Sequence, residues 1–220
     1  SLTVRVEAMQ ERKEGNMIWV KCRLVSDLVN SKGEVFGEPR IHHEATVRLV
    51  ELSDDLRPFL ESEVGEIPQI GAPPDGELQH HSSFIYLRYF HGPRFQSHGG
   101  VIRGIEDGVD GIALMRHQLP AKDQFLVETQ GEEVLLEALP MLIEAGFQNA
   151  GLAAMESEGF SSLPIGIDWT TMLRVPETDE KLRVRSVKVG SEDSGVTIHD
   201  VVIIGDDDAP VLSLKGLRLK

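Results

Sequence analysis

Cysteine is almost absent from this chain of 220 residues, with Cys22 as its single thiol. One thiol excludes an internal disulfide bond and a zinc site built from thiolates, and it indicates a reducing, cytoplasmic setting. Apolar and basic residues alternate around it, over residues 19–25. We therefore interpret Cys22 as a small, buried strand residue and not as a nucleophile.

Long apolar runs and basic clusters are missing too. No run approaches the ~18–20 residues of a membrane helix, and the N-terminus lacks the basic and apolar segments of a signal peptide. It reads instead as the start of a strand in a piece of a longer chain. The chain has 22 basic and 36 acidic residues, which gives a net charge of −14. Since nucleic-acid binding needs clustered Lys and Arg, we expect neither a nucleic acid nor a membrane as partner.

What is present is the composition of a folded globular chain, with 40% hydrophobic and 26% charged residues. Two-residue alternation predicts strands, and their expected ranges are 2–9, 17–25, 45–50, 84–90, 96–105, 111–116, 170–175, 182–189, 196–204 and 211–219. Residues 53–80 lack periodicity and are rich in proline and glycine, which predicts a linker.

One segment has the composition of a helix. Residues 139–158 are rich in Ala, Leu and Glu, with Pro140 suited to a first helical position and Gly159 to the stop. Gly146 and Gly151 would each cost about 1 kcal/mol in a helix, which indicates a backbone lying close to something, such as the concave face of a sheet. Strands, one long central helix and more strands predict an α+β hot-dog: an antiparallel sheet wrapped round that helix.

The helix carries the first candidate site. Glu144 and Gln148 are four residues apart, so their side chains lie on one face, one turn apart. Apolar neighbours favour the neutral carboxyl group that a general acid needs, and Gln148 could orient it by a hydrogen bond.

A second candidate is the segment Phe90 to Gln96, in which Gly92-Pro93 breaks a strand and exposes backbone N–H groups that could polarise a carbonyl. Other polar clusters offer less. The adjacent pairs His42-His43 and His80-His81 point to opposite faces of strands, so we expect no metal site. Asp206, Asp207 and Asp208 predict a solvated turn.

Three segments resemble, in order and spacing, the dehydratase domains of modular polyketide synthases and polyunsaturated fatty acid synthases. Phe90 to Gln96 resembles their Tyr-Gly-Pro-x-Phe-Gln element, and Leu139 to Gln148 resembles their Pro-x-Leu-x-Asp-x-x-x-Gln helix. Leu163 to Asp168 resembles the Leu-Pro segment that opens the next strand. The resemblance covers roughly residues 80–220, with a weaker likeness over residues 2–52.

The resemblance implies a double hot-dog with a partial first half. Residues 1–52 would be the strands of that first half, residues 53–80 a linker, and residues 81–220 a second hot-dog with its central helix at about 139–158. It also implies elimination of water from β-hydroxyacyl thioesters held on the phosphopantetheine of an acyl carrier protein. No other cofactor is implied. The partners would be the carrier protein and neighbouring synthase domains, and the free sheet edges suggest a homodimer or a pseudo-dimer of the two halves.

Site roles follow from the same resemblance. Glu144 would protonate the departing hydroxyl, with Gln148 in support. The expected substrate-binding residues are Gly92 and Pro93 at the thioester end, Phe90, His91 and Phe95 along the acyl tunnel, and Leu163 and Pro164.

Two departures leave alternatives open. The family's helix carboxylate is Asp, whereas this chain has the longer Glu144, and none of its eight histidines has the family's His-x-x-x-Gly-x-x-x-x-Pro spacing. Whether the chain is an enzyme therefore stays open, with His91 as a stand-in base. The alternatives are a non-catalytic acyl-binding or scaffolding module of a megasynthase and a product-template-like cyclase.

Overall fold

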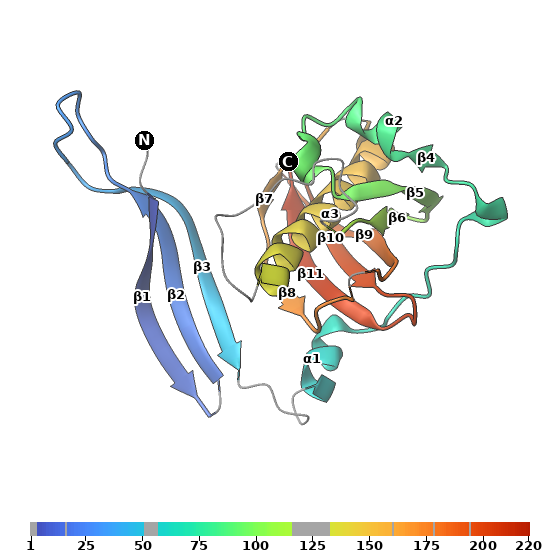
Figure 1. Ribbon diagram of the computed structural model, residues 1–220, viewed down its shortest axis with the longest axis horizontal. Coiled ribbons are helices and arrows are strands. Elements are labelled where there is room, and N and C mark those ends of the chain that lie inside the picture. Colours follow the sequence, from blue (N-terminus) through green and yellow to red (C-terminus); the bar gives the residue numbers. More distant parts are fainter. Residues whose placement is uncertain are drawn as a thin grey trace. The chain divides into compact units, whose positions relative to one another are not determined.

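The computed structural model describes residues 4–15, 17–50, 57–115, 133–159, 161–177, 179–193 and 195–220. The chain divides into two compact units, Ser1–Leu56 and Arg57–Lys220 (Figure 1). Across the described ranges, no helix is long and apolar enough to cross a membrane.

The first unit is a three-stranded antiparallel sheet in the order β1-β2-β3. Its strands are β1 (Val4–Glu14), β2 (Met17–Ser26) and β3 (Arg40–Val50). The register places Val20 opposite Val47 of β3 and Glu11 of β1, on a face that mixes apolar and charged residues. The other face is charged, and Arg23 Nε donates to Glu7 at 2.7 Å there. Cys22 lies in strand β2 as we expected, but it is half-buried and not buried.

The second unit is built on an eight-stranded antiparallel sheet. Along it the strand order is β4-β5-β6-β9-β10-β11-β7, and β8 also pairs with β11. The strands are β4 (His80–His81), β5 (His98–Ile105), β6 (Gly108–Ala113), β7 (Pro164–Gly166), β8 (Trp169–Met172), β9 (Leu182–Glu192), β10 (Val196–Ile204) and β11 (Pro210–Leu219). The helices are α1 (Arg57–Val64), α2 (Ser82–Tyr86) and α3 (Glu133–Glu158), with short 3-10 turns at η1 (Pro74–Gly76) and η2 (Pro93–Phe95).

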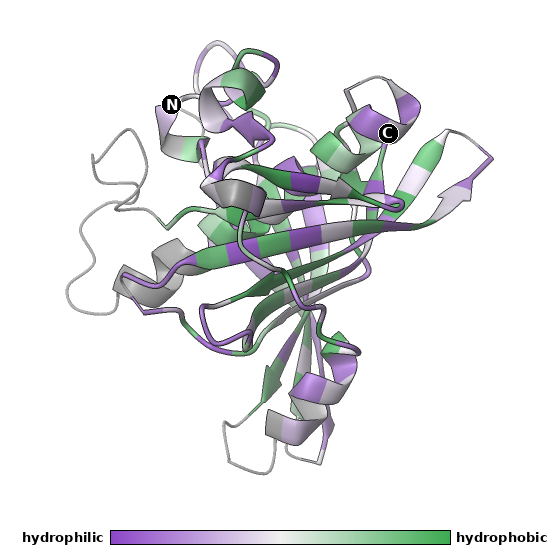
Figure 2. Ribbon diagram, turned by 90° about the vertical axis from the view of Figure 1, so that its right-hand side faces the viewer, coloured by the Kyte–Doolittle hydropathy of each residue, from purple (hydrophilic) through white to green (hydrophobic). Residues whose placement is uncertain are grey.

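The long helix α3 lies against β5, β6, β9, β10 and β11, so the sheet wraps it as predicted (Figure 1). Hydrophobic and hydrophilic residues alternate along the long strands (Figure 2), and the hydrophobic ones meet the helix. The largest buried cluster joins Leu142 and Ala145 of α3 to Val184, Val201 and Leu214 of the sheet. The predicted α+β hot-dog class is confirmed.

The start of α3 differs from the prediction. The helix begins at Glu133, not near Leu139, and Pro140 lies inside it at an exposed position. Proline has a φ that suits a helix and costs one backbone hydrogen bond, so it does not have to mark the first turn.

The two helical glycines lie where the backbone is closely approached. A Cβ on Gly146 would come 2.7 Å from Leu214 Cδ1 of β11, so this glycine does face the sheet. A Cβ on Gly151 would come 2.5 Å from the hydroxyl of Tyr89. Both are shorter than any real Cβ contact, which explains why residues with poor helix propensity stand there.

The prediction of a strand at residues 84–90 is wrong. Residues 82–86 form α2, and the segment continues irregularly to η2. Ile85 and Tyr89 are four residues apart and both join a cluster that includes Val101 of β5. A short apolar run carries too few residues for its period to distinguish a strand from a helix.

The segment predicted as a linker, 53–80, belongs to the second unit from Arg57 onward. Its first residues, 53–56, lie outside the described ranges. From Arg57 onward it contains α1 and η1, and Val64 and Ile70 are buried beside Ile204. Arg183 also donates to the carbonyl of Ile70. Buried apolar residues therefore attach this Pro- and Gly-rich segment to the sheet by packing.

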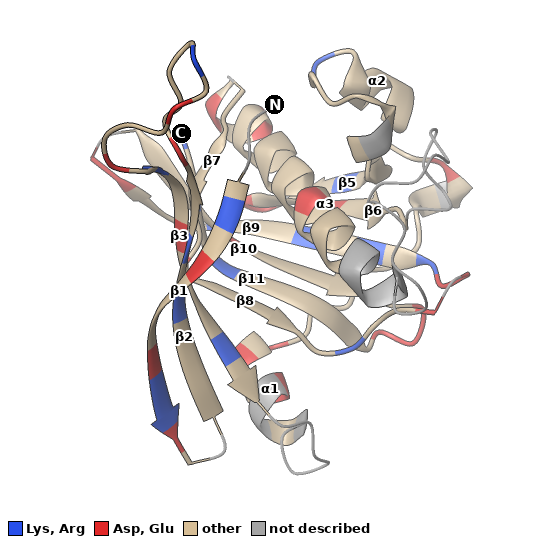
Figure 3. Cartoon of the chain, turned by 60° about the vertical axis from the view of Figure 1, so that its left-hand side comes forward, with Lys and Arg blue, Asp and Glu red and all other residues tan. Residues whose placement is uncertain are grey.

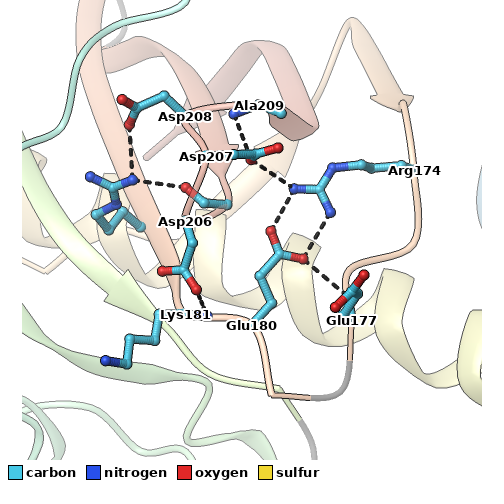
Figure 4. A network of polar contacts seen from close by, with 10 residues as sticks. Arg174, Glu177, Glu180, Lys181, Asp206, Asp207, Asp208 and Ala209 are labelled. Atoms are coloured by element: carbon cyan, nitrogen blue, oxygen red, sulfur yellow. Dashed lines mark hydrogen bonds and ion pairs between the residues drawn. The ribbon is translucent and has the colours of Figure 1, made fainter.

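The acidic turn behaves as expected for a solvated turn (Figure 4). Asp208 accepts from Arg183 at 2.8 Å, Asp207 lies 3.6 Å from Arg174, and Asp206 accepts a backbone N–H. Among the described residues, no group of three or more His, Cys, Asp or Glu is arranged to hold a metal ion.

Candidate active site

The predicted contact between Glu144 and Gln148 is present on α3. Gln148 Nε2 donates to Glu144 Oε1 at 2.9 Å. Glu144 is the only charged residue between Leu139 and Met155, and most of α3 is correspondingly tan, with acidic residues as red bands (Figure 3). Its side chain is 21% exposed, whereas Gln148 is 2% exposed. A carboxyl group with a fixed hydrogen-bond donor therefore projects from an otherwise neutral helix face.

The amide of Gln148 is oriented from several sides. Its Oε1 accepts from the Tyr86 hydroxyl at 2.6 Å, and its Nε2 also donates to the Phe95 carbonyl at 2.6 Å. The Tyr86 oxygen accepts from the backbone N–H of His98 at 2.8 Å, so its own hydrogen is free for Gln148. This chain of donors and acceptors forces the NH₂ group of Gln148 to face Glu144.

Behind this pair lies a buried polar network that keeps its groups neutral. Burial lowers the pKa of His98 to about 4, so its imidazole is uncharged at neutral pH. Its Nδ1 accepts from the N–H of Gly100, and its Nε2 lies 2.8 Å from Asn149 Oδ1, which places the proton on Nε2. Burial also raises the pKa of Tyr86 and of Tyr89, so both hydroxyls stay protonated.

The second predicted element meets Glu144 from the opposite side. Gly92 caps η2, where Phe95 N–H donates to its carbonyl at 2.9 Å, and Gln96 Nε2 donates to the His91 carbonyl at 3.1 Å. This turn brings His91 Nε2 to 2.8 Å from Glu144 Oε1. The imidazole and the carboxyl group thus form a pair that the sequence spacing, 53 residues, did not suggest.

A cavity of about 510 Å³ opens beside the pair. Eight of the nine predicted site residues line it: Phe90, His91, Gly92, Phe95, Glu144, Gln148, Leu163 and Pro164. The ninth, Pro93, is not among its lining residues. Phe90 is 80% exposed, so it lies at the mouth rather than along an enclosed tunnel.

Sequence reasoning missed the rest of the lining, which comprises Arg88, Tyr89, Phe147, Gly151, Ser161 and Ser162. Phe147 and Gly151 continue the helical stripe that begins at Glu144, at steps of three and seven residues, and that signal could have found them. Tyr89 was hidden by the mistaken strand.

No protein-family model matches the chain, and no curated protein matches it in sequence. Solved structures do match. A trans-AT polyketide synthase dehydratase domain from Brevibacillus brevis is 14% identical, with a TM-score of 0.59, over 100% of this chain and 75% of that one. The RzxB dehydratase domain from Pseudomonas fluorescens is 13% identical, with a TM-score of 0.56, over 100% and 75%.

The dehydratase domain from the CurJ module of the curacin polyketide synthase is 13% identical, with a TM-score of 0.58, over 96% of this chain. This chain spans 66% of that structure and 65% of a second CurJ dehydratase structure, slightly less than two thirds of their length. The chain therefore has the fold of polyketide synthase dehydratase domains, as its three motifs predicted.

Proposed function

We propose that the chain is a dehydratase unit that eliminates water from β-hydroxyacyl thioesters. The observation that carries this proposal is the Glu144–Gln148 contact of 2.9 Å at the edge of a 510 Å³ cavity, within a fold shared with dehydratase domains. A fixed carboxyl group beside a cavity with an apolar lining suits proton donation to a leaving hydroxyl.

In the proposed reaction the Cα–H bond gives its proton to a base, and the electron pair forms the Cα=Cβ bond. The Cβ–O bond breaks, and the departing oxygen takes the proton of Glu144 and leaves as water. Gln148 holds Glu144 Oε1, which leaves Oε2 to carry the proton. The Gly92 N–H, at the turn before η2, would polarise the thioester carbonyl.

The thioester would arrive on the phosphopantetheine of an acyl carrier protein, within a synthase of several domains. The cavity volume and the exposed Phe90 and Leu163 in its lining support an acyl chain entering from solvent. The free thiol of Cys22 supports a cytoplasmic setting.

The test incubates the 220-residue chain with 3-hydroxybutyryl-pantetheine and follows enoyl thioester formation by mass spectrometry. Glu144→Gln should lower the rate by about 10²–10⁴-fold, the usual contribution of a general acid. Glu156→Gln is the matched control, because Glu156 lies exposed on the same helix outside the cavity. Binding of the thioester without turnover would instead support the acyl-binding alternative.

A further inference from the structure

The carboxyl group of Glu144 is held by two nitrogens that come from different parts of the second unit. Its Oε1 accepts from Gln148 Nε2 at 2.9 Å and lies 2.8 Å from His91 Nε2, which is also hydrogen-bond distance. The first nitrogen comes from the next turn of α3, and the second from the turn that precedes η2. A long side chain held from two elements loses much of its rotational freedom.

These contacts belong to a closed circuit of hydrogen bonds between α3 and the turn that contains η2. Gln148 Nε2 also donates to the Phe95 carbonyl at 2.6 Å, so one amide group contacts both Glu144 and the end of the turn. His91 lies at the start of the turn and contacts the same Glu144 oxygen. Between them, the Phe95 N–H donates to the Gly92 carbonyl at 2.9 Å. Both ends of the turn therefore restrain the candidate acid.

The imidazole of His91 is itself fixed, as a group that restrains another must be. Its ring stacks on Phe90 with centroids 4.6 Å apart and meets the edge of Tyr89 at 5.4 Å. Gln96 Nε2 donates to its backbone carbonyl at 3.1 Å. Its side chain is 17% exposed, so water has little access to compete for the contact with Glu144.

The two partners of this contact are also the two motif positions in the site at which the chain departs from the motifs that it resembles. Glu144 stands where the helix motif has Asp, and His91 stands where the turn motif has Tyr. Glu carries its carboxyl group farther from the backbone than Asp does, and His carries its outer polar atom less far than Tyr does. The longer acid therefore meets the shorter partner.

We propose, resting on the function above, that His91 is a positioning residue that fixes Glu144 together with Gln148, and that Glu144 and His91 are a matched pair. The role is restraint of the carboxyl group by the Nε2 contact, and it holds whichever of the two groups carries the shared proton. A displacement of about 1 Å at a reacting group costs about 100-fold in rate, so this restraint should be visible in kcat.

Two substitutions of His91 separate restraint from other roles. The amide of Gln can occupy the position of the imidazole Nε2 and offers either a donor or an acceptor, whereas Leu offers neither. In the dehydration of 3-hydroxybutyryl-pantetheine, His91→Leu should lower kcat about 10–100-fold, and His91→Gln should retain most of it. His81 is exposed in β4 and lies outside the cavity lining, so His81→Leu is the matched control and should retain kcat.

Exchanging both motif residues tests the pair itself. Glu144→Asp withdraws the carboxyl group from the imidazole, and His91→Tyr crowds it, so each change alone should lower kcat. The double variant should exceed, by at least about tenfold, the kcat expected if the two losses simply multiplied. Melting temperatures check that each variant is folded.

Equal and large losses of kcat in folded His91→Gln and His91→Leu would overturn restraint as the role of His91. Wild-type kcat with a raised KM in His91→Leu would also overturn it, because that result marks a residue that only lines the cavity. Losses that multiply in the double variant would overturn the matched pair. Failure of the wild type to form the enoyl thioester would instead overturn the proposed function, on which this inference rests.

Discussion

Removing the hydroxyl of Tyr86 tests the network that orients the candidate acid. In Tyr86→Phe, two buried groups lose their partner: Oε1 of Gln148, at 2.6 Å, and the N–H of His98, at 2.8 Å. Both residues are almost completely buried, at 2% and 0% exposure, so water cannot easily replace the hydroxyl. Leaving a buried polar group unsatisfied costs about 1–3 kcal/mol, so with two such groups the free energy of unfolding should fall by about 2–6 kcal/mol.

The same change should affect catalysis by a different route. Tyr86 does not line the cavity, so KM for the thioester should change little. Without the Tyr86 hydroxyl, only the Phe95 carbonyl still holds the Gln148 NH₂ group towards Glu144, so the amide is less firmly oriented and kcat should fall.

Urea denaturation measures the stability loss, and steady-state dehydration kinetics measure the second effect. Tyr89→Phe is the comparison for stability, because the Tyr89 hydroxyl bonds the Gln148 backbone carbonyl at 2.9 Å and leaves the amide alone. It should cost about 1 kcal/mol. A loss below 1 kcal/mol in Tyr86→Phe, with kcat unchanged, would refute the orientation argument.

Three further predictions concern the second unit. Asp110 is fully buried and pairs with Arg185, so Asp110→Asn should lower the free energy of unfolding, measured by urea denaturation, by about 3–5 kcal/mol. Asp168→Asn, at an exposed ion pair, should lower it by less than about 1 kcal/mol. Equal losses in the two variants would contradict this prediction. Gly151→Ala should lower the melting temperature although Ala has the better helix propensity, because the new Cβ would lie 2.5 Å from the Tyr89 hydroxyl. A higher melting temperature would refute this packing. The pKa of His98, about 4, lies below its ordinary value of 6.5, so in this range the unfolded chain binds a proton that the folded chain does not. The free energy of unfolding should therefore fall by about 3 kcal/mol as the pH falls from 6.5 to 4. An NMR titration of His98 with a midpoint near 6.5 would contradict this prediction.

Helix α3 shows how far sequence reasoning reached. The Glu144–Gln148 contact followed from a spacing of four residues, because helix geometry alone brings such side chains together. The close approach of the backbone at Gly146 followed from the cost of glycine in a helix. These inferences rest on local geometry, which a sequence carries directly.

The remainder of the site depends on contacts that no local pattern contains. Tyr86 reaches Gln148 across 62 residues, and it lies in a segment whose short apolar run was mistaken for a strand. His91 meets Glu144 only because the turn at Gly92 folds back towards α3. The burial of Ile70 depends likewise on tertiary packing, in a stretch whose prolines and glycines suggested a linker.

The most direct test of the central claim compares dehydration with binding in wild type and Glu144→Gln. A group that acts on the transition state lowers kcat when removed and leaves substrate affinity nearly unchanged. We therefore predict that wild type converts 3-hydroxybutyryl-pantetheine to the enoyl thioester, and that Glu144→Gln binds it with similar Kd but forms product at least about 100-fold more slowly. Equal rates of product formation in the two proteins would contradict the assignment of Glu144 as the acid.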